Sequence, residues 1–216
     1  MKTALDKARQ DPESMKARIL TVARRIFGDY GYHGTTTRMI AQEVGIDVST
    51  LHYHWGDKKG LYEAVVLDIN KDLGQSLRDV ERMIHGKPLG ERLAISIDVM
   101  TDYLFEHPEI ANLILHRYFG RTREEALEEI LVPEFTADMA RSMNLIESKR
   151  KATPRALMEV LAVINGIYNF VSGETFFRSI VHIDREEYIT QVKEVLKFIL
   201  IPAFAQREGK GGSEPA

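Results

Sequence analysis

The chain has 216 residues, 44% hydrophobic and 28% charged, with a formal net charge of −3 at pH 7. This length accommodates one large or two small domains with a substantial core. Cysteine is absent, which excludes disulfides and thiolate metal ligands. No stretch approaches the roughly 20 apolar residues of a membrane span, and the polar start lacks an apolar signal region. We therefore expect a cytoplasmic protein with no membrane partner.

The N-terminal 30 residues divide into a polar arm and a helix. Residues 1–10 are polar, and we predict a flexible N-terminal arm. Over residues 12–30, apolar side chains recur at the spacing of an amphipathic helix: Ile19, Val22, Ala23, Ile26, Phe27 and Tyr30. Asp11 before Pro12 is a suitable cap for the start of this helix, and Gly31 and Gly34 are expected to end it.

Residues 35–61 have the spacing of a helix-turn-helix, in which the second helix enters the DNA major groove. The positions that define the motif are Ile40, Ala41, Val44, Gly45, Ile46 and Leu51. Thr35 or Thr36 can cap the first helix, Asp47 the second, and Asp57 the helix that follows. Other helical hairpins show similar spacings, so the prediction of DNA binding also depends on the flanking sequence. Residues 1–60 hold ten Lys/Arg and seven Asp/Glu, which makes this end mildly basic.

The remainder of the chain has helical periodicity and no strand pattern. A helix is predicted from Lys58 to about Met83, another ends at His107-Pro108, and Pro133 interrupts a later one. The last two helices are long and apolar on more than one face, with Phe176 and Phe177 added to the first of them. We predict an all-α fold: a three-helix DNA-binding domain over residues 11–57, a larger effector-binding and dimerisation domain over 58–205, and a disordered tail over 206–216.

The sequence contains no recognisable catalytic motif. It has no phosphate-binding glycine loop, no H-E-x-x-H and no G-x-S-x-G, so we predict no catalytic residue, no cofactor and no enzyme activity. The carboxylates at 124–129 are expected on a solvated helix face. His52 and His54 point to different faces of a helix, so no metal site is predicted.

Several short elements together identify a family resemblance. They are Gly31-Tyr32, Thr36, Ile40-Ala41, Gly45-Ile46-Asp47, Thr50-Leu51-His52-Tyr53-His54-Trp55 and Asp57-Lys58-Lys59-Gly60-Leu61. This ensemble resembles the N-terminal domain of the tetracycline-repressor (TetR/AcrR-type) family of bacterial helix-turn-helix transcriptional regulators. It covers about the first third of the chain. The departures are His52 where tyrosine is usual, Trp55 for phenylalanine, and Gly60 in a first helical turn.

The resemblance implies contacts to the DNA backbone from Thr36, Tyr53, His54 and Lys58. Base readers are expected on the exposed face of the second motif helix, at Val48, Ser49, Thr50 and His52, and Arg38 lies at the same basic end. The implied function is a homodimeric repressor that a small, largely apolar effector releases from a palindromic operator. The alternative is a DNA-organising or constitutive DNA-binding protein without an effector.

Two further sets of residues follow from the second domain. Candidates for the effector pocket, each with ordinary core packing as the alternative, are Met100, Tyr103, Leu104, Leu113, His116, Arg117, Met139, Met143, Asn165 and Tyr168. The second apolar face of the last two helices predicts a dimer through a four-helix bundle, with burial inside one subunit as the alternative. Its candidate residues are Leu161, Phe170, Phe177, Val192, Leu196 and Ile199.

Overall fold

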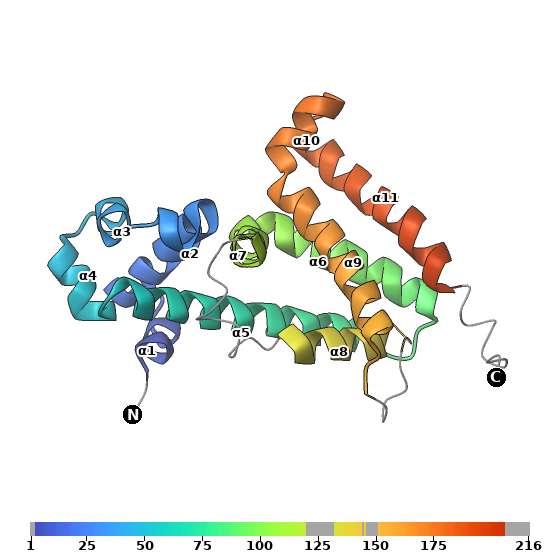
Figure 1. Cartoon of the computed structure of the whole chain (residues 1–216), viewed down its shortest axis with the longest axis horizontal. Coiled ribbons are helices and arrows are strands. Elements are labelled where there is room, and N and C mark those ends of the chain that lie inside the picture. The colour runs from blue at the N-terminus through green and yellow to red at the C-terminus, as the bar shows by residue number, and fades with distance from the viewer. Residues whose placement is uncertain (1–2, 120–131, 144, 146–150, 206–216) are drawn as a thin grey trace. The chain divides into compact units, whose positions relative to one another are not determined.

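A computed structural model describes residues 3–119, 132–143, 145 and 151–205. Every regular element in these ranges is an α-helix, which confirms the predicted all-α class (Figure 1). The helices are α1 (Ala4–Gln10), α2 (Met15–Gly34), α3 (Thr37–Val44), α4 (Val48–Trp55), α5 (Lys58–Ile84), α6 (Leu89–Glu106), α7 (Pro108–Phe119), α8 (Val132–Ser142), α9 (Pro154–Ser172), α10 (Glu174–Val181) and α11 (Arg185–Ala205).

The described residues form two compact units that do not coincide with the predicted domains. Unit 1 takes residues 3–73 and 108–119, and unit 2 takes residues 74–107, 132–143, 145 and 151–205. The expected boundary at residues 57 and 58 is replaced by a division within α5. The cause is packing: the first part of α5 belongs with the N-terminal helices, and so does α7. The predicted tail at 206–216 and the carboxylates at 124–129 lie outside the described residues.

The predicted flexible arm contains a helix instead. Thr3 begins α1 with a reciprocal cap: its hydroxyl accepts the Asp6 N–H at 3.1 Å, and its own N–H donates to the Asp6 carboxylate at 3.1 Å. Such a capping box satisfies two backbone donors that a helix start leaves without partners. Leu5 and Ala8 are buried, and α1 packs on α2. The prediction of a flexible arm is therefore wrong for residues 4–10, where two apolar side chains and a cap are sufficient.

Ser14 begins α2 by accepting the Ala17 N–H at 3.2 Å. Asp11, predicted as this cap, instead ends α1. The apolar stripe of α2 is buried as expected, with Ile19, Ala23 and Phe27 fully covered. Gly31 interrupts the helical backbone at φ 65°, a conformation that disfavours any side chain.

Helices α2 and α7 approach each other so closely at Gly28 that no side chain fits there. A Cβ atom at this position would lie 2.9 Å from Cα of Glu109, well inside van der Waals contact. Ile110 and Leu113 of α7 are buried as well. The glycine thus brings α7, which is distant in sequence, against the middle of α2.

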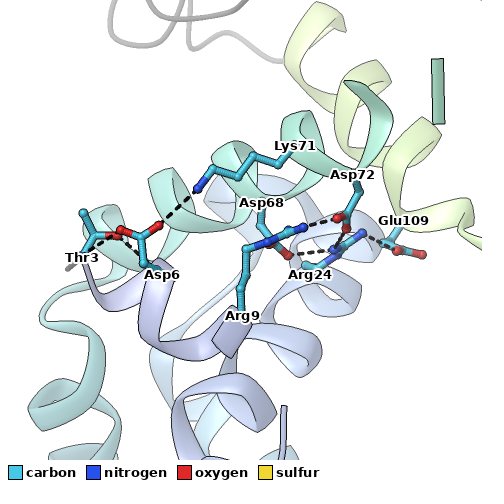
Figure 2. Close-up of polar contacts among 8 residues, drawn as sticks. All are labelled: Thr3, Asp6, Arg9, Arg24, Asp68, Lys71, Asp72 and Glu109. Atoms are coloured by element: carbon cyan, nitrogen blue, oxygen red, sulfur yellow. Dashed lines mark hydrogen bonds and ion pairs between the residues drawn. The ribbon is translucent and has the colours of Figure 1, made fainter. Parts of the chain in front are cut away.

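A network of charged side chains links the helices of unit 1 (Figure 2). Asp68 of α5 is 4% exposed and accepts from Arg9 of α1 at 2.5 Å and from Arg24 of α2 at 2.7 Å. Asp72, one turn further along α5, pairs with the same two arginines at 2.9 and 2.5 Å. Arg24 also reaches Glu109 of α7 at 3.3 Å. Two guanidinium groups thereby connect four helices, and we call these five residues the Asp68 network.

Unit 2 is built around an apolar cluster and a pair of long helices. Buried side chains of α6, α8, α9 and α11 meet in one core, made of Leu89, Leu93, Ala140, Met143, Ala156, Val160 and Phe204. Along α6 and α11, Asp98 pairs with Lys197 at 2.5 Å, and Asp102 pairs with Lys193. Phe176 and Phe177, predicted as part of the preceding helix, lie in α10, which is separated from α9 at Gly173.

No single described helix has both the length and the apolar composition to cross a membrane. One bent pair, α9 with α10, meets those two requirements together, with an angle of 76° between the helices.

Replacing Asp68 by asparagine should destabilise unit 1 by about 3 kcal/mol, since removing one partner leaves buried charge without compensation. The chain has a single tryptophan, Trp55, which is buried in unit 1, so its fluorescence during urea unfolding measures the effect. Asp79→Asn is the matched control on the same helix, because Asp79 makes exposed contacts with Arg82 and Gln75, and its replacement should change stability by less than about 1 kcal/mol. Equal unfolding midpoints for both variants would show that the network does not stabilise the unit.

Candidate nucleic-acid interface

Each helix of the predicted helix-turn-helix begins at a side-chain cap. The Thr36 hydroxyl accepts the Met39 N–H at 3.2 Å and begins α3. Asp47 accepts the Thr50 N–H at 2.7 Å and begins α4, and Asp57 accepts the Gly60 N–H at 2.8 Å at the start of α5. Of the two alternatives for α3, Thr36 is thus the cap. Thr35 is buried, and its hydroxyl faces the carbonyl oxygens of Gly31 at 2.8 Å and Ile26 at 3.2 Å.

The crossing of α3 and α4 has the predicted core. Ile40, Ala41, Val44 and Leu51 are buried, while Ile46, which was expected in the same core, is partly exposed. Gly45 ends α3 in the left-handed region, at φ 79° and ψ 37°, and its N–H donates to the carbonyl of Ala41. This conformation is common for glycine at a helix C-terminus, and it turns the chain so that α4 can begin at Val48.

Lys58 has structural partners in addition to its predicted role at DNA. Its ammonium group donates to the carbonyls of Tyr32 at 2.9 Å and Thr35 at 3.1 Å, and lies 4.2 Å from the centroid of the Tyr32 ring. An ammonium group has three donors, so two are used inside unit 1. The chain between α2 and α3 is thereby tied to the start of α5.

The C-terminal end of α4 is joined to the start of α2 by Lys16, a residue that the sequence analysis did not identify. Its ammonium group donates to the His54 carbonyl at 2.7 Å and lies 3.5 Å from Nδ1 of the same histidine. In return, the Trp55 indole N–H donates to the Lys16 carbonyl at 3.2 Å. Burial, and then the Lys16 charge, lower the pKa of His54 below its usual value. His54 is therefore a neutral hydrogen-bonding group at neutral pH rather than a positive charge.

The outer face of α4 carries the predicted base-reading side chains. Ser49, His52 and Tyr53 are exposed, Tyr53 at 85% of its surface, while Val48 and Thr50 are partly exposed. The Ser49 hydroxyl donates to Asp47 at 2.5 Å. Hydrogen bonds from the Ser49 hydroxyl, and next from Thr50, hold the pKa of Asp47 below its ordinary range, so the cap stays ionised.

The basic residues near this face divide into two groups. Arg24 belongs to the Asp68 network, and Arg25 pairs with Glu43 at 2.5 Å and Asp29 at 3.7 Å, so these cations are neutralised within unit 1. Arg38 and Lys59 are exposed. Lys59 was missed by the sequence analysis, although its position beside Lys58 at a helix start was a usable signal.

The predicted effector-pocket residues are divided between the two units. Leu113, His116 and Arg117 belong to unit 1, where the His116 ring lies 3.2 Å from the position of a Cβ atom on Gly31. Burial lowers the pKa of Arg117. Within unit 2, Met100, Leu104, Met143 and Tyr168 are buried, Tyr103, Met139 and Asn165 are partly buried, and the Asn165 amide donates to its own helix at Leu161.

The predicted dimer residues have different exposures. Val192 and Leu196 are buried inside the protomer, because they share the inward face of α11 with Tyr188. Leu161, Phe170 and Phe177 are partly covered, and Ile199 is exposed. The outward face of α11 instead presents Val195, Phe198 and Ile199 at helical spacing, with Phe198 80% exposed.

Within the described ranges, no group of three or more His, Cys, Asp or Glu side chains is arranged to hold a metal ion.

Replacing Lys16 by methionine should raise the pKa of His54 toward its ordinary value of 6.5, because a positive charge beside the imidazole disfavours protonation. The pKa should remain below 6.5, since burial is the larger cause. Proton titration followed by NMR measures the change, with Lys59→Met as the lysine control. In the wild type, the lowered pKa also means that unit 1 loses stability as the pH falls through about 6.5. An unchanged or lower His54 pKa in Lys16→Met would contradict the arrangement.

Comparisons with known proteins find relatives among bacterial transcriptional regulators. Residues 19–65 match the family model described as bacterial regulatory proteins, tetR family. The HTH-type transcriptional regulator UidR of Escherichia coli (strain K12) is 23% identical over 131 residues, which cover 55% of this chain and 66% of that protein. The negative transcriptional regulator IcaR of the icaADBC biofilm operon in Staphylococcus aureus (strain Newman) is 35% identical over 92 residues, or 43% of this chain and 45% of IcaR. The chain thus matches about two thirds of UidR and less than half of IcaR.

A likeness of the whole fold extends beyond these segments. The structure of a TetR-like transcriptional regulator from Rhodococcus sp. RHA1 superposes with a TM-score of 0.56 at 16% identity, covering 90% of this chain and 94% of that one. The relatives are regulators and not enzymes. In its motif, its relatives and its fold, the chain is similar to bacterial regulatory proteins of the tetR family.

Proposed function

We propose that this protein is a homodimeric transcriptional regulator, most simply a repressor, that binds a palindromic operator in bacterial DNA and is released from it by a small, largely apolar effector. The observation that carries the proposal is the outer face of α4. It exposes Ser49, His52 and Tyr53 on a helix that is fixed at both ends, by Asp47 at its start and by Lys16 at its end. A protein that acts on chromosomal DNA in this way works in the cytoplasm.

Some of the proposed contacts position the protein on the DNA backbone, and others read the base sequence. Thr36 lies at the start of α3, where unpaired N–H groups favour a phosphate. Tyr53, Arg38 and the third donor of Lys58 are further phosphate contacts, and His54 takes part as a neutral hydrogen-bonding group. Base reading falls to Val48, Ser49, Thr50 and His52, which follow one another along the outer side of α4.

The dimer is supported by apolar side chains left uncovered in unit 2. Val195, Phe198 and Ile199 form a stripe on α11, and Phe176 and Ile180, separated by one turn of α10, are 65% and 57% exposed. Exposed apolar patches of this kind mark interaction surfaces. A two-fold axis through α10 and α11 gives an isologous interface and two recognition helices for half-sites one helical turn, about 34–36 Å, apart.

An effector site in the helical core of unit 2 is supported by a polar atom without a partner. Thr101 of α6 is fully buried, and its hydroxyl has no hydrogen bond within the described structure. Buried hydroxyl groups are normally satisfied, and a ligand that supplies an acceptor would satisfy this one. The effector releases DNA only if its affinity differs between the DNA-bound and released conformations.

A first test is DNA binding as a function of salt, on random duplex and on the DNA upstream of the gene. Tight binding to the upstream DNA alone is expected, and Tyr53→Ala should weaken it roughly tenfold because one contact to a charged phosphate is lost. Tyr30→Ala is the control, since Tyr30 is also exposed in unit 1 but lies outside α3 and α4. Equally weak and salt-sensitive binding to both duplexes, with or without Tyr53, would favour a non-specific DNA-organising protein.

A second test concerns the dimer. Phe198→Lys should raise the dimer dissociation constant about tenfold or more, because it places a charge at the centre of the apolar stripe. Phe119→Lys is the matched control, as Phe119 is 79% exposed and lies in unit 1. Sedimentation velocity across a dilution series measures both variants. An unaltered dimer in Phe198→Lys, or an equal effect of Phe119→Lys, would locate the interface elsewhere.

A further inference from the structure

The two ends of α4 remove hydrogen-bond donors from its outer face. At the start, the single hydroxyl proton of Ser49 is donated to the Asp47 carboxylate at 2.5 Å. At the end, Nδ1 of the His52 ring lies 2.5 Å from the carbonyl oxygen of Gly56. A carbonyl oxygen can only accept, so Nδ1 must carry the ring proton in this contact.

The proton on Nδ1 determines the chemistry of the rest of the ring. In a neutral imidazole, one nitrogen is a donor and the other is an acceptor, and the hydrogen bond of the first determines which. With Nδ1–H bound to Gly56, the other nitrogen, Nε2, has a lone pair and no proton. His52 is exposed, so this lone pair is available for an external donor.

The carbonyl that fixes the ring depends on the backbone of Gly56. This residue ends α4 at φ 75° and ψ −131°, in a region that side chains strongly disfavour. Its N–H donates to the backbone carbonyl of His52 at 2.8 Å, while its own carbonyl receives the His52 ring. His52 and Gly56 therefore form two hydrogen bonds, one in each direction, and these bonds fix the ring at the C-terminal end of α4.

We propose that the outer face of α4 reads exocyclic amino groups in the major groove, with His52 Nε2 accepting from adenine N6 or cytosine N4. Ser49 and His52 are three residues apart and share one helix face, and both present lone pairs. Guanine and thymine direct oxygen acceptors into the major groove, and these oppose an acceptor on the protein. The proposal rests on the proposed function, because it assigns the base chemistry to a face that must first meet DNA.

Selection of bound sequences from a random duplex library tests the assignment. The wild type should enrich one base pair at one position of each half-site, and the identity of that pair shows whether the amino group is that of adenine or of cytosine. His52→Phe should lose the preference at that position alone. His52→Arg, which supplies only donors, should instead favour guanine at the same position, with affinity roughly tenfold higher than for the base that the wild type selects. The control is His85→Phe, which replaces an exposed histidine of unit 2 and should leave the motif unchanged.

A modified operator then identifies the group that is read. Replacing the selected adenine by purine, or the selected cytosine by its analogue without the amino group, should weaken wild-type binding and leave binding by His52→Phe unaffected. In the free protein, ¹⁵N NMR of the imidazole should show a protonated Nδ1 and an unprotonated Nε2 for His52.

The outcomes separate the two proposals. No enriched motif from the wild type would overturn the proposed function and this inference together. A motif that His52→Phe leaves unchanged, wild-type binding that is unaffected by removal of the amino group at the selected position, or an Nε2–H tautomer in the NMR spectrum would overturn the inference alone.

Discussion

The buried carboxylate of Asp68 is the constraint on which unit 1 depends. It lies on α5 and holds Arg9 and Arg24, and through Arg24 it reaches Glu109 on α7. A charge that is 4% exposed must be paired, so the helices that supply its partners have to stay together. Helices α3 and α4 pack on α2, and the network holds α2 near its middle, at Arg24. Electrostatics at one side of the unit thus complement the apolar packing around Phe27 and Leu51.

Helix α4 is held in place by a few local contacts rather than by a large core. It has eight residues, too few for a stable isolated helix. Asp47 caps it, Leu51 and Trp55 anchor it, and Lys16 donates to the His54 carbonyl near its end. The groups that hold α4 in place also determine the chemistry of its surface, since Asp47 and the Gly56 carbonyl accept hydrogen bonds from side chains on the exposed face. The stability of α4 and the hydrogen-bonding groups of its outer face therefore depend on the same residues.

Local chemistry made much of this fold predictable. The Asp47 and Asp57 caps, the Gly45 turn and the boundary at His107-Pro108 depend on neighbouring residues and were predicted from the sequence, and Thr36 was one of two candidates for the α3 cap. Long-range packing was not predictable: periodicity identified the apolar face of α11 but could not show that Val192 and Leu196 face their own protomer. The helix α1 was missed because its polar composition hides two buried side chains. The proton positions on α4 depend on the backbone angles of Gly56, which no spacing pattern indicates.

The close approach of α7 to Gly28 has a consequence for the way proteins of this kind can be recombined. The unit that carries the helix-turn-helix is discontinuous in sequence, because α7 follows α6 by a single residue, His107, yet packs with α2. A chimera that grafts residues 1–57 onto a foreign effector domain would separate Gly28 from the helix it fits and Arg24 from two of its helices. To exchange DNA specificity between relatives, one must therefore either transfer α7 together with the N-terminal segment or exchange only the outer residues of α4.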